Sequence, residues 1–251
     1  MSAPESTATS LLEARGVAKR YGHVTALRGV DFSLEAGETH AIVGDNGAGK
    51  STLVKILSGA IAPSEGELYV DGGQVAFTTP EDAFRAGIST VYQNLALVGC
   101  RNIAENLFLG KEPTRFGIVA KAKMHREAAE MLAGLRQMNV RDTTAKVEDL
   151  SGGQRQAVAI ARGMHQARRI LILDEPTAAL GVQESHEILN LIQGLKSESR
   201  SVLIVSHNLA HVFRVADRIT VLRGGLRVGT VRTGESTPDE IVRMITGASL
   251  L

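Results

Sequence analysis

The residues with the clearest chemical potential form the octapeptide GDNGAGKS, from Gly44 to Ser51. It satisfies G-x-x-x-x-G-K-[ST], a pattern whose glycines let the backbone wrap around phosphate oxygens and turn its N–H groups inward. The apolar segment His40–Val43 precedes it and a helical pattern starting at Lys50 follows, which predicts a strand, a loop and a helix in that order. The octapeptide is therefore predicted to be a phosphate-binding loop (the phosphate loop, 44–51), with the positive end of the helix dipole facing the anion.

Individual residues of the phosphate loop have distinct expected roles. Lys50 would place a point charge on the outer phosphates, and the Ser51 hydroxyl would ligate Mg²⁺. A glycine-rich turn that matches by chance is the alternative, and the strand and helix on either side argue against it. The predicted nucleotide contacts here are Gly44, Asp45, Asn46, Gly47, Ala48, Gly49, Lys50, Ser51 and Thr52.

A second group of candidate residues is the acid pair Asp174 and Glu175, which follows the apolar segment Ile170–Leu173. A strand this apolar is expected to be buried on both faces, as in a parallel sheet. Because side chains alternate along a strand, one acid can face a metal ion while the other faces a water molecule. Asp174 is thus a predicted Mg²⁺ ligand, and Glu175 is the predicted residue that orients or deprotonates the water. Taken alone, the pair could instead be a solvated helix cap.

The pentapeptide LSGGQ at positions 150–154 is a second predicted anion site. A serine hydroxyl and glycine N–H groups would lie there at the start of a helix. One chain would then hold two phosphate-binding elements. The second need not bind the nucleotide that the phosphate loop of the same chain holds. The predicted nucleotide contacts here are Ser151, Gly152, Gly153 and Gln154.

This combination of motifs resembles the ABC ATPases, whose signature motif is LSGGQ, and the resemblance runs from about Leu11 to about Ala248. In that family two subunits face each other head to tail, and each signature motif completes the ATP site on the partner's phosphate loop. The resemblance implies an α/β fold with a P-loop NTPase (RecA-like) core, an N-terminal antiparallel β region and an inserted α-helical subdomain. It also implies ATP hydrolysis and the cofactors ATP and Mg²⁺.

The resemblance adds three residues to the candidate site. Tyr21 matches the aromatic residue that stacks on adenine, Gln93 the glutamine that reaches Mg²⁺ and the water, and His207 the histidine that contacts the γ-phosphate. Without the family resemblance, Tyr21 would be interpreted as an ordinary half-exposed tyrosine, and His207 as a polar residue with ordinary hydrogen-bond partners. The implied catalytic residues are Lys50, Gln93, Glu175 and His207, and the implied metal ligands are Ser51, Gln93 and Asp174.

Two positions depart from the family pattern. After Glu-Pro-Thr the family usually continues Ser-Ala-Leu-Asp, whereas this chain has Ala-Ala-Leu-Gly, ending at Gly181. The usual Asp helps to link the two active sites across the dimer, so that link is in doubt here, while hydrolysis should survive. Ala157 stands where Arg is common.

Two segments, VYQNLALVGCRNIAENLFLGKEP and TAALGVQES, resemble ATP-binding subunits of bacterial monosaccharide importers of the ribose and fructose type. A single phosphate loop and a single signature motif are typical of the fructose-type subunits. The resemblance implies a homodimer below two transmembrane permease subunits, peripheral on the cytoplasmic face of the inner membrane, and served by an extracytoplasmic solute-binding protein. The sugar itself would be selected by those partners, and import of a non-sugar solute is the main alternative.

Apolar segments of strand length alternate with helical patterns, as in α/β proteins with parallel strands. From about Asn94 to Met164 the strand signals vanish and helical periodicity dominates, and Lys111–Phe116 is predicted to be a loop. The predicted organisation is a flexible tail at 1–10, a RecA-like core with its β subdomain at 11–93 and 165–251, and a helical subdomain at 94–164 that carries the signature motif.

The expected strands are Leu11–Val17, Val30–Leu34, Thr39–Val43, Gly66–Val70, Ser89–Tyr92, Ile170–Leu173, Val202–Val205, Ile219–Leu222 and Leu226–Val231. The expected helices are Gly49–Ser58, Pro80–Ala86, Lys123–Met138, Gly152–Met164, Glu184–Ser197, Leu209–Ala216 and Pro238–Ile245. Thr237 is the predicted cap of the last helix.

Composition narrows the class of protein. The chain has 251 residues, of which 43% are hydrophobic, so a sizeable core can form without disulfides. Lys plus Arg number 28 against 27 Asp plus Glu, a balance that argues against a nucleic-acid partner. The single cysteine, Cys100, fits a reducing compartment, and no apolar stretch reaches the length of a membrane span. The polar N-terminus does not have the pattern of a secretory signal.

Two other classes of function compete with the importer subunit. A soluble ABC ATPase of DNA repair, chromosome structure or translation would carry long coiled coils, zinc sites or basic linkers, and only 100 positions separate Lys50 from Leu150. A nucleotide-sensing module without turnover would not need Glu175 and His207, and a phosphate-release assay would identify it. ATP-versus-GTP preference and regulation are not encoded in any motif found here.

Overall fold

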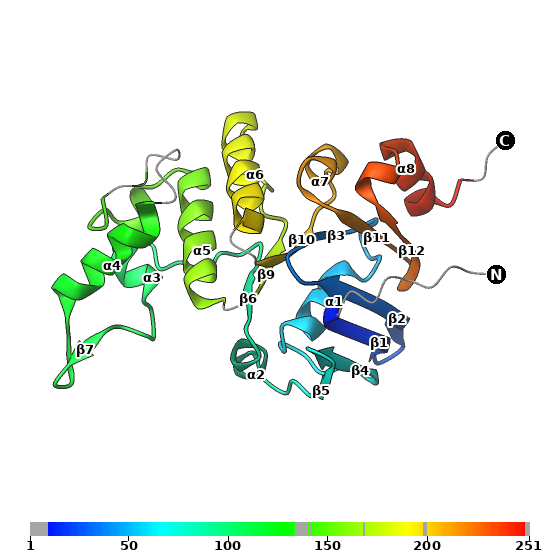
Figure 1. The fold of residues 1–251 in the computed structure, drawn as a ribbon, viewed down its shortest axis with the longest axis horizontal. Helices are drawn as coiled ribbons and strands as arrows, with labels where there is room; N and C mark the ends of the chain where they lie inside the picture. The colour runs from blue at the N-terminus through cyan, green and yellow to red at the C-terminus, as the bar shows by residue number, and fades with distance from the viewer. Residues whose placement is uncertain (1–9, 134–139, 141, 168, 198–199, 249–251) are drawn as a thin grey trace.

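The structure, a computed structural model, describes residues 10–133, 140, 142–167, 169–197 and 200–248 (Figure 1). Its larger sheet has six strands in the order β12-β11-β3-β10-β9-β6. Neighbouring strands in it run parallel, except that β12 runs antiparallel to β11. The strands are β3 (Thr39–Val43), β6 (Ile88–Val91), β9 (Ile170–Asp174), β10 (Ser201–Val205), β11 (Arg218–Arg223) and β12 (Leu226–Arg232).

A second, four-stranded antiparallel sheet contains the N-terminal part of the described chain, in the order β2-β1-β4-β5. Its strands are β1 (Ser10–Tyr21), β2 (Val24–Glu35), β4 (Glu65–Val70) and β5 (Gly73–Val75). The helices are α1 (Lys50–Leu57), α2 (Pro80–Arg85), α3 (Ile103–Leu107), α4 (Lys121–Ala133), α5 (Gly152–Gln166), α6 (Val182–Ser197), α7 (Leu209–Val215) and α8 (Pro238–Thr246). The predicted fold class, an α/β P-loop NTPase core with an antiparallel β region, is confirmed.

The six-stranded sheet separates two hydrophobic clusters. Along β3, Ala41 and Val43 lie in one cluster and Ile42 in the other, as side-chain alternation requires of a strand buried on both faces. The first cluster includes residues of α3, α4, α5, α6 and α7. The second joins α1 to the antiparallel sheet, so α1 lies between the two sheets (Figure 1).

The segment predicted as a helical subdomain contains α3, α4 and α5, which stand at the end of the molecule away from the antiparallel sheet (Figure 1). Along α4 the buried residues Met124, Ala128 and Leu132 recur every fourth position, which places them on one face of the helix. That face packs in the cluster shared with α5 and α6. Among the described residues, no helix is both long and apolar enough to cross a bilayer.

The prediction that Lys111–Phe116 is a loop, in a segment without strands, is wrong. Thr114–Arg115 (β7) pairs with Ile118–Val119 (β8) in a short antiparallel hairpin. Both turn residues, Phe116 and Gly117, have positive φ, at 52° and 79°. Two such residues suit the tight turns that match the twist of a hairpin, and strands of two residues are too short to show periodicity in the sequence.

Several predicted boundaries also differ. The predicted tail ends in Ser10, which begins β1, and residues 1–9 lie outside the described residues. Strands β1 and β2 run longer than predicted, because exposed charged residues such as Arg20 interrupt their apolar pattern. Strand β5 was not predicted. The helix predicted to end at Met138 is described as far as Ala133, and its remainder lies outside the described residues. Helix α8 starts at Pro238 and is capped by Thr237, as predicted.

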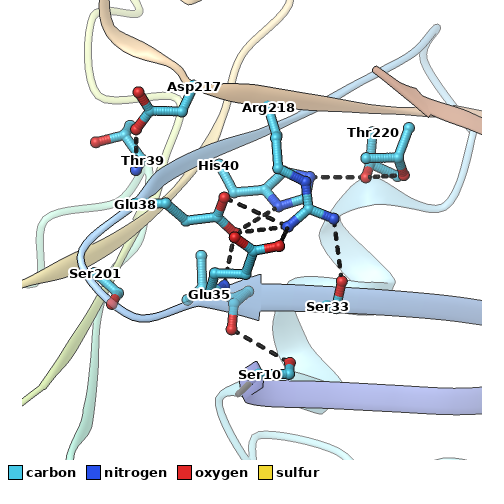
Figure 2. Close-up of polar contacts among 12 residues, drawn as sticks. Ser10, Ser33, Glu35, Glu38, Thr39, His40, Ser201, Asp217, Arg218 and Thr220 are labelled. Carbon is cyan, nitrogen blue, oxygen red and sulfur yellow. Dashed lines mark hydrogen bonds and ion pairs between the residues drawn. The ribbon is translucent and has the colours of Figure 1, made fainter. Parts of the chain in front are cut away.

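A buried polar cluster ties the two sheets together at the amino ends of β3 and β11 (Figure 2). His40 is fully buried, with Nε2 2.8 Å from Oγ1 of Thr220 and Nδ1 3.3 Å from Oε1 of Glu38. Arg218 donates to Glu38 at 3.1 Å and to Glu35, in β2, at 3.0 Å. Below, these residues are called the amino-end cluster.

Two pKa values in the amino-end cluster are shifted. Burial lowers the pKa of His40, and its contact with Glu38 does not offset that effect. Burial alone would raise the pKa of Glu38, but its contacts with His40, the backbone of Glu35 and Arg218 lower it overall. Burial therefore favours the neutral form of His40, whereas the contacts of Glu38 favour its ionised form.

Candidate nucleotide-binding site

The backbone of the phosphate loop passes so close to its neighbours that two positions require glycine. Gly44 follows β3 with φ 151°, and a Cβ there would overlap the carbonyl oxygen of Leu222 in β11. Gly49 has φ 103°, and a Cβ there would lie 2.7 Å from Cδ2 of Leu27 and 2.8 Å from the carbonyl oxygen of Ala26. The loop is thus wedged between β11 and β2, as a phosphate cradle requires.

Helix α1 begins at Lys50, within the last two residues of the phosphate loop, and no side chain caps its first N–H groups. All residues of α1 are described; its N-cap is Gly49, no side chain caps it, and no acid lies in its first turn. Such a helix start, with the positive end of the dipole, favours an anion. The predicted ligand Ser51 lies in this turn with an exposed side chain, and Thr52 is half-buried beside it.

Lys50 is buried and holds the phosphate loop closed on itself. Its Nζ donates to the carbonyl oxygens of Gly44 at 2.7 Å and Asp45 at 3.0 Å. Burial lowers its pKa, and the carboxylates of Glu175, Asp45 and Asp174 oppose that shift. A desolvated ammonium bonded to carbonyl oxygens can exchange them for phosphate oxygens, which carry full charge.

The acid pair lies at the carboxyl end of β9, beside the carboxyl end of β10. Burial raises the pKa of Asp174, the charge of Glu175 raises it further, and Lys50 and Lys55 oppose both effects. Glu175 has φ 51°, a left-handed conformation that costs free energy for a non-glycine residue, and its N–H donates to the carbonyl of Val205 at 2.9 Å. Asp174 therefore ends the strand, whereas Glu175 lies in the turn that follows it.

His207 follows β10 and meets Glu175, with Nδ1 2.9 Å from Oε2 of the carboxylate. Its side chain is 70% exposed, whereas that of Glu175 is 15% exposed. A cavity of about 280 Å³ lies between this histidine and the phosphate loop; it is lined by Val43, Gly44, Asp45, Asn46, His207 and Ile245. The lining therefore comes from the end of β3 and the loop after it, from the segment that follows β10, and from α8.

Tyr21 and Gln93 have exposed side chains on the two sides of this region. Tyr21 ends β1, is 47% exposed, and belongs to the hairpin that leads into Ala26 and Leu27 beside the phosphate loop. Gln93 comes two residues after β6, whose last residue is in register with Leu173 of β9, so it lies at the same sheet edge as the acid pair. Both side chains are exposed, Tyr21 on the hairpin that reaches the phosphate loop and Gln93 at the sheet edge that carries the acid pair.

The donor set at this edge fits Mg²⁺ bound through a nucleotide. Ser51 and Asp174 offer a hydroxyl and a carboxylate, the hard oxygen ligands that Mg²⁺ prefers. Among the residues that the structure describes, no group of three or more His, Cys, Asp or Glu could hold a metal by itself. A site of this kind leaves positions on the ion for water and phosphate oxygens.

The predicted second anion site lies in a different part of the chain. Ser151 caps α5: its Oγ accepts from the N–H of Gln154 at 3.2 Å, and the Gln154 side chain accepts from the N–H of Ser151 at 3.0 Å. Helix α5 packs in the first hydrophobic cluster and α1 in the second, with β6 and β9 between them (Figure 1). The structure thus gathers the phosphate loop, the acid pair and His207, but leaves the signature motif apart from them.

Two residues, one beside the signature motif and one beside the acid pair, carry contacts that the sequence did not reveal. The carboxylate of Glu184, in the first turn of α6, accepts from Oγ of Ser151 at 2.9 Å. His211, in α7, has Nδ1 3.0 Å from Oγ1 of Thr177, just after the acid pair. Both contacts join residues more than thirty positions apart, and no local motif announces them.

A glycine-rich loop between a buried parallel strand and a helix, with an acid pair on a neighbouring strand, defines a P-loop nucleotide-binding protein. The family model for the ABC transporter family (ABC_tran) matches residues 27–178. The chain therefore belongs to the ABC transporter family, of which it is an ATP-binding cassette.

Similar proteins include several import ATPases. The chain is 46% identical to "Fructose import ATP-binding protein FrcA" of Rhizobium meliloti, covering 95% of this chain and 94% of that one. It is 44% identical to "Xylose/arabinose import ATP-binding protein XylG" of Sulfolobus acidocaldarius, covering 96% of both. It is 46% identical to "Ribose import ATP-binding protein RbsA 1" of Rubrobacter xylanophilus, where it spans only 48% of the relative.

Solved structures extend the likeness to the fold. The ADP conformation of MJ1267, an ATP-binding cassette of an ABC transporter, superposes with a TM-score of 0.83 at 26% identity, covering 95% of this chain and 99% of that one. The dimeric post-hydrolysis state of the cassette MJ0796, bound to ADP and Pi, superposes with a TM-score of 0.75 at 26% identity, covering 88% and 98%.

Proposed function

We propose that this chain is the ATP-hydrolysing subunit of an ABC importer and that the imported solute is a monosaccharide. The observation that carries the proposal is the separation of two phosphate-binding elements, the phosphate loop on α1 and the signature motif on α5. The names of the fructose, xylose/arabinose and ribose relatives support the sugar class.

Nucleotide binding is assigned to the phosphate loop and its surroundings. Lys50 exchanges its bonds to the carbonyl oxygens of Gly44 and Asp45 for phosphate oxygens, and the first N–H groups of α1 bind the same phosphates. Tyr21 stacks on the base with its exposed ring. Ser51, Asp174 and Gln93 hold Mg²⁺, which would neutralise charge on the phosphates.

Water activation is assigned to Glu175 and His207. An ionised carboxylate has no hydrogen to donate, so the histidine carries its hydrogen on Nδ1 in this contact. Its Nε2 can then interact with the γ-phosphate of a nucleotide bound in the cavity. Glu175 orients the attacking water and accepts its proton, a role that the strained turn supports by fixing the carboxylate.

The signature motif completes the site of a second copy. In a head-to-tail homodimer, Ser151 and the N–H groups at 152–154 would bind the γ-phosphate held by the partner's phosphate loop. The segment at 94–164 would form the helical subdomain that docks on two permease subunits at the cytoplasmic face of the inner membrane, with an extracytoplasmic solute-binding protein delivering the sugar.

The test uses Glu175→Gln in the full-length protein. We expect this variant to bind ATP with unchanged affinity and to form a nucleotide-dependent dimer, while phosphate release falls by about 100-fold or more. Normal phosphate release would contradict the role of Glu175. Absence of an ATP-dependent dimer would contradict the shared site.

Transport itself requires a second test. Co-purification with the permease, followed by ATPase measurement with and without sugar-loaded binding protein, is expected to show stimulation by the loaded protein. Stimulation by a binding protein loaded with a non-sugar solute would move the proposal to that solute class.

A further inference from the structure

A carboxylate of the same chain occupies the donors of the signature motif. Oε1 of Glu184 accepts from Oγ of Ser151 at 2.9 Å and from the N–H of Gly153 at 3.2 Å. Oε2 accepts from the N–H of Gly181 at 3.3 Å. Three donors, two at the start of α5 and one just before α6, therefore converge on a single acid.

The side chain of Glu184 also packs tightly against the backbone of the signature motif. A Cβ added at Gly153 would lie 2.9 Å from both Cβ and Cγ of Glu184, so this side chain fills the space that the glycine leaves. Ser151 and Gly153 begin α5, whereas Glu184 lies in the first turn of α6. The contact thus joins the starts of two helices.

The chemistry of these donors is that of an anion site. A hydroxyl and a backbone N–H at the start of a helix bind phosphate and carboxylate oxygens alike. The hydrogen bonds from Ser151, Gly153 and Gly181 lower the pKa of Glu184, so they favour the ionised form of this carboxyl still further. The signature motif of an isolated subunit therefore already holds a negative charge.

We propose that Glu184 is a built-in competitor for the signature motif, whose carboxylate must leave Ser151 and Gly153 before they can bind the γ-phosphate on the partner subunit. The proposal rests on the proposed function, because it needs a phosphate to arrive from a second copy. It makes Glu184 a residue that sets the ATP concentration at which two subunits close.

Removing the competitor should favour closure. In the Glu175→Gln background, in which ATP is expected to bind without being hydrolysed, we expect Glu184→Ala to lower the ATP concentration at half-maximal dimerisation by about fivefold. The reason is that two charge-assisted hydrogen bonds per site no longer need to be broken. Light scattering during an ATP titration measures this midpoint. Glu184→Gln keeps the shape of the side chain without its charge, and we expect a smaller decrease in the same direction.

The matched control is Glu187→Ala. Glu187 lies three residues further along α6, carries the same charge and contacts Gln183 at 3.4 Å instead of the signature motif. We expect its midpoint to stay within about twofold of the parent. A thermal unfolding curve for each variant establishes that it is folded before the titration.

The direction of the shift decides the outcome. If Glu184 only braces the signature motif, its removal would loosen Ser151 and raise the midpoint, so an unchanged or raised midpoint in both Glu184 variants would overturn the proposal. An equal decrease in Glu187→Ala would also overturn it, because general charge would then be the cause. If the Glu175→Gln parent fails to dimerise with ATP, the proposed function fails and the inference falls with it.

Discussion

The two ends of the central strands use polar residues in opposite ways. At the amino ends of β3 and β11, Glu38, His40 and Arg218 are paired with one another and largely buried (Figure 2). At the carboxyl ends, His207 is 70% exposed, and Glu175 sits in a left-handed turn. Polar groups that satisfy one another inside the core stabilise a fold, whereas exposed or strained polar groups at strand ends are typical of a ligand site.

The largest expected effect on function comes from Lys50→Ala. Loss of its charge should weaken ATP binding by at least about 100-fold, because the site loses its desolvated ammonium. The free energy of unfolding should change by less than about 1 kcal/mol, because the loss of two hydrogen bonds is offset by the removal of a buried charge. Calorimetric ATP titration and denaturant unfolding measure the two quantities. A stability loss as large as that of Arg218→Ala would erase the contrast between the two ends.

The amino-end cluster should show the reverse pattern. We expect Arg218→Ala to lower the free energy of unfolding by about 3 kcal/mol, because it leaves Glu38 buried without its cation. ATP affinity of the folded protein should stay within about twofold. The control is Arg101→Ala, whose ion pair with Glu105 at 3.5 Å is exposed and should cost less than about 1 kcal/mol. Equal losses in both variants would contradict a structural role for the cluster.

The pH dependence of stability sharpens the comparison further. Burial lowers the pKa of His40 below its ordinary value of 6.5, so below that pH the unfolded chain takes up a proton that the folded protein does not. The free energy of unfolding should therefore fall on account of this residue as the pH drops below about 6.5. The lowered pKa of Glu38 acts in the same direction only below its ordinary value of 4.5.

Denaturant unfolding at a series of pH values measures this dependence. His40→Gln removes the titrating ring and should flatten the curve between about pH 6.5 and about pH 5, whatever its effect on stability at neutral pH. If the free energy of unfolding of His40→Gln falls with decreasing pH as steeply as that of the parent, groups other than His40 cause the pH dependence.

The carboxyl end of the sheet was largely predictable from sequence, because its elements are local. The strand, loop and helix around Gly44–Ser51 each follow from a run of neighbouring residues, and the structure confirms the order β3, loop, α1. The apolar run before Asp174 likewise identified β9. The assignments of individual residues to ATP and Mg²⁺ stay predictions.

The amino-end cluster and Glu184 could not be predicted, because they form only when distant segments meet. Arg218 reaches Glu38 across 180 positions and Ser151 reaches Glu184 across 33. No periodicity or motif encodes either contact. The β7–β8 hairpin was missed for a different reason: its strands are two residues long, and only the turn at Phe116 and Gly117 distinguishes it from a loop.

The smallest expected effect concerns Gly181, which lies beside the contact between Glu184 and Ser151. This contact shares one feature with the amino-end cluster and one with the carboxyl ends of the strands. Glu184 is satisfied by hydrogen bonds, like the amino-end cluster, yet it lies on a proposed ligand site. A Cβ at Gly181 would be 3.9 Å from Oε2 of Glu184, so Gly181→Asp would bring a second carboxylate beside the first. Repulsion should weaken the hold of Glu184 on Ser151 and lower the ATP midpoint of dimerisation by about twofold.

Gly181→Ala is the matched control, since it adds the Cβ without the charge and should leave the midpoint unchanged. The carboxylate introduced by Gly181→Asp could also contact the partner subunit directly, and a double-mutant cycle separates the two effects. If that carboxylate acts through Glu184, its effect should vanish in the Glu184→Ala background. A shift that persists there would show instead that position 181 acts across the dimer. The hydrogen bonds of Glu184 would then not control the signature motif.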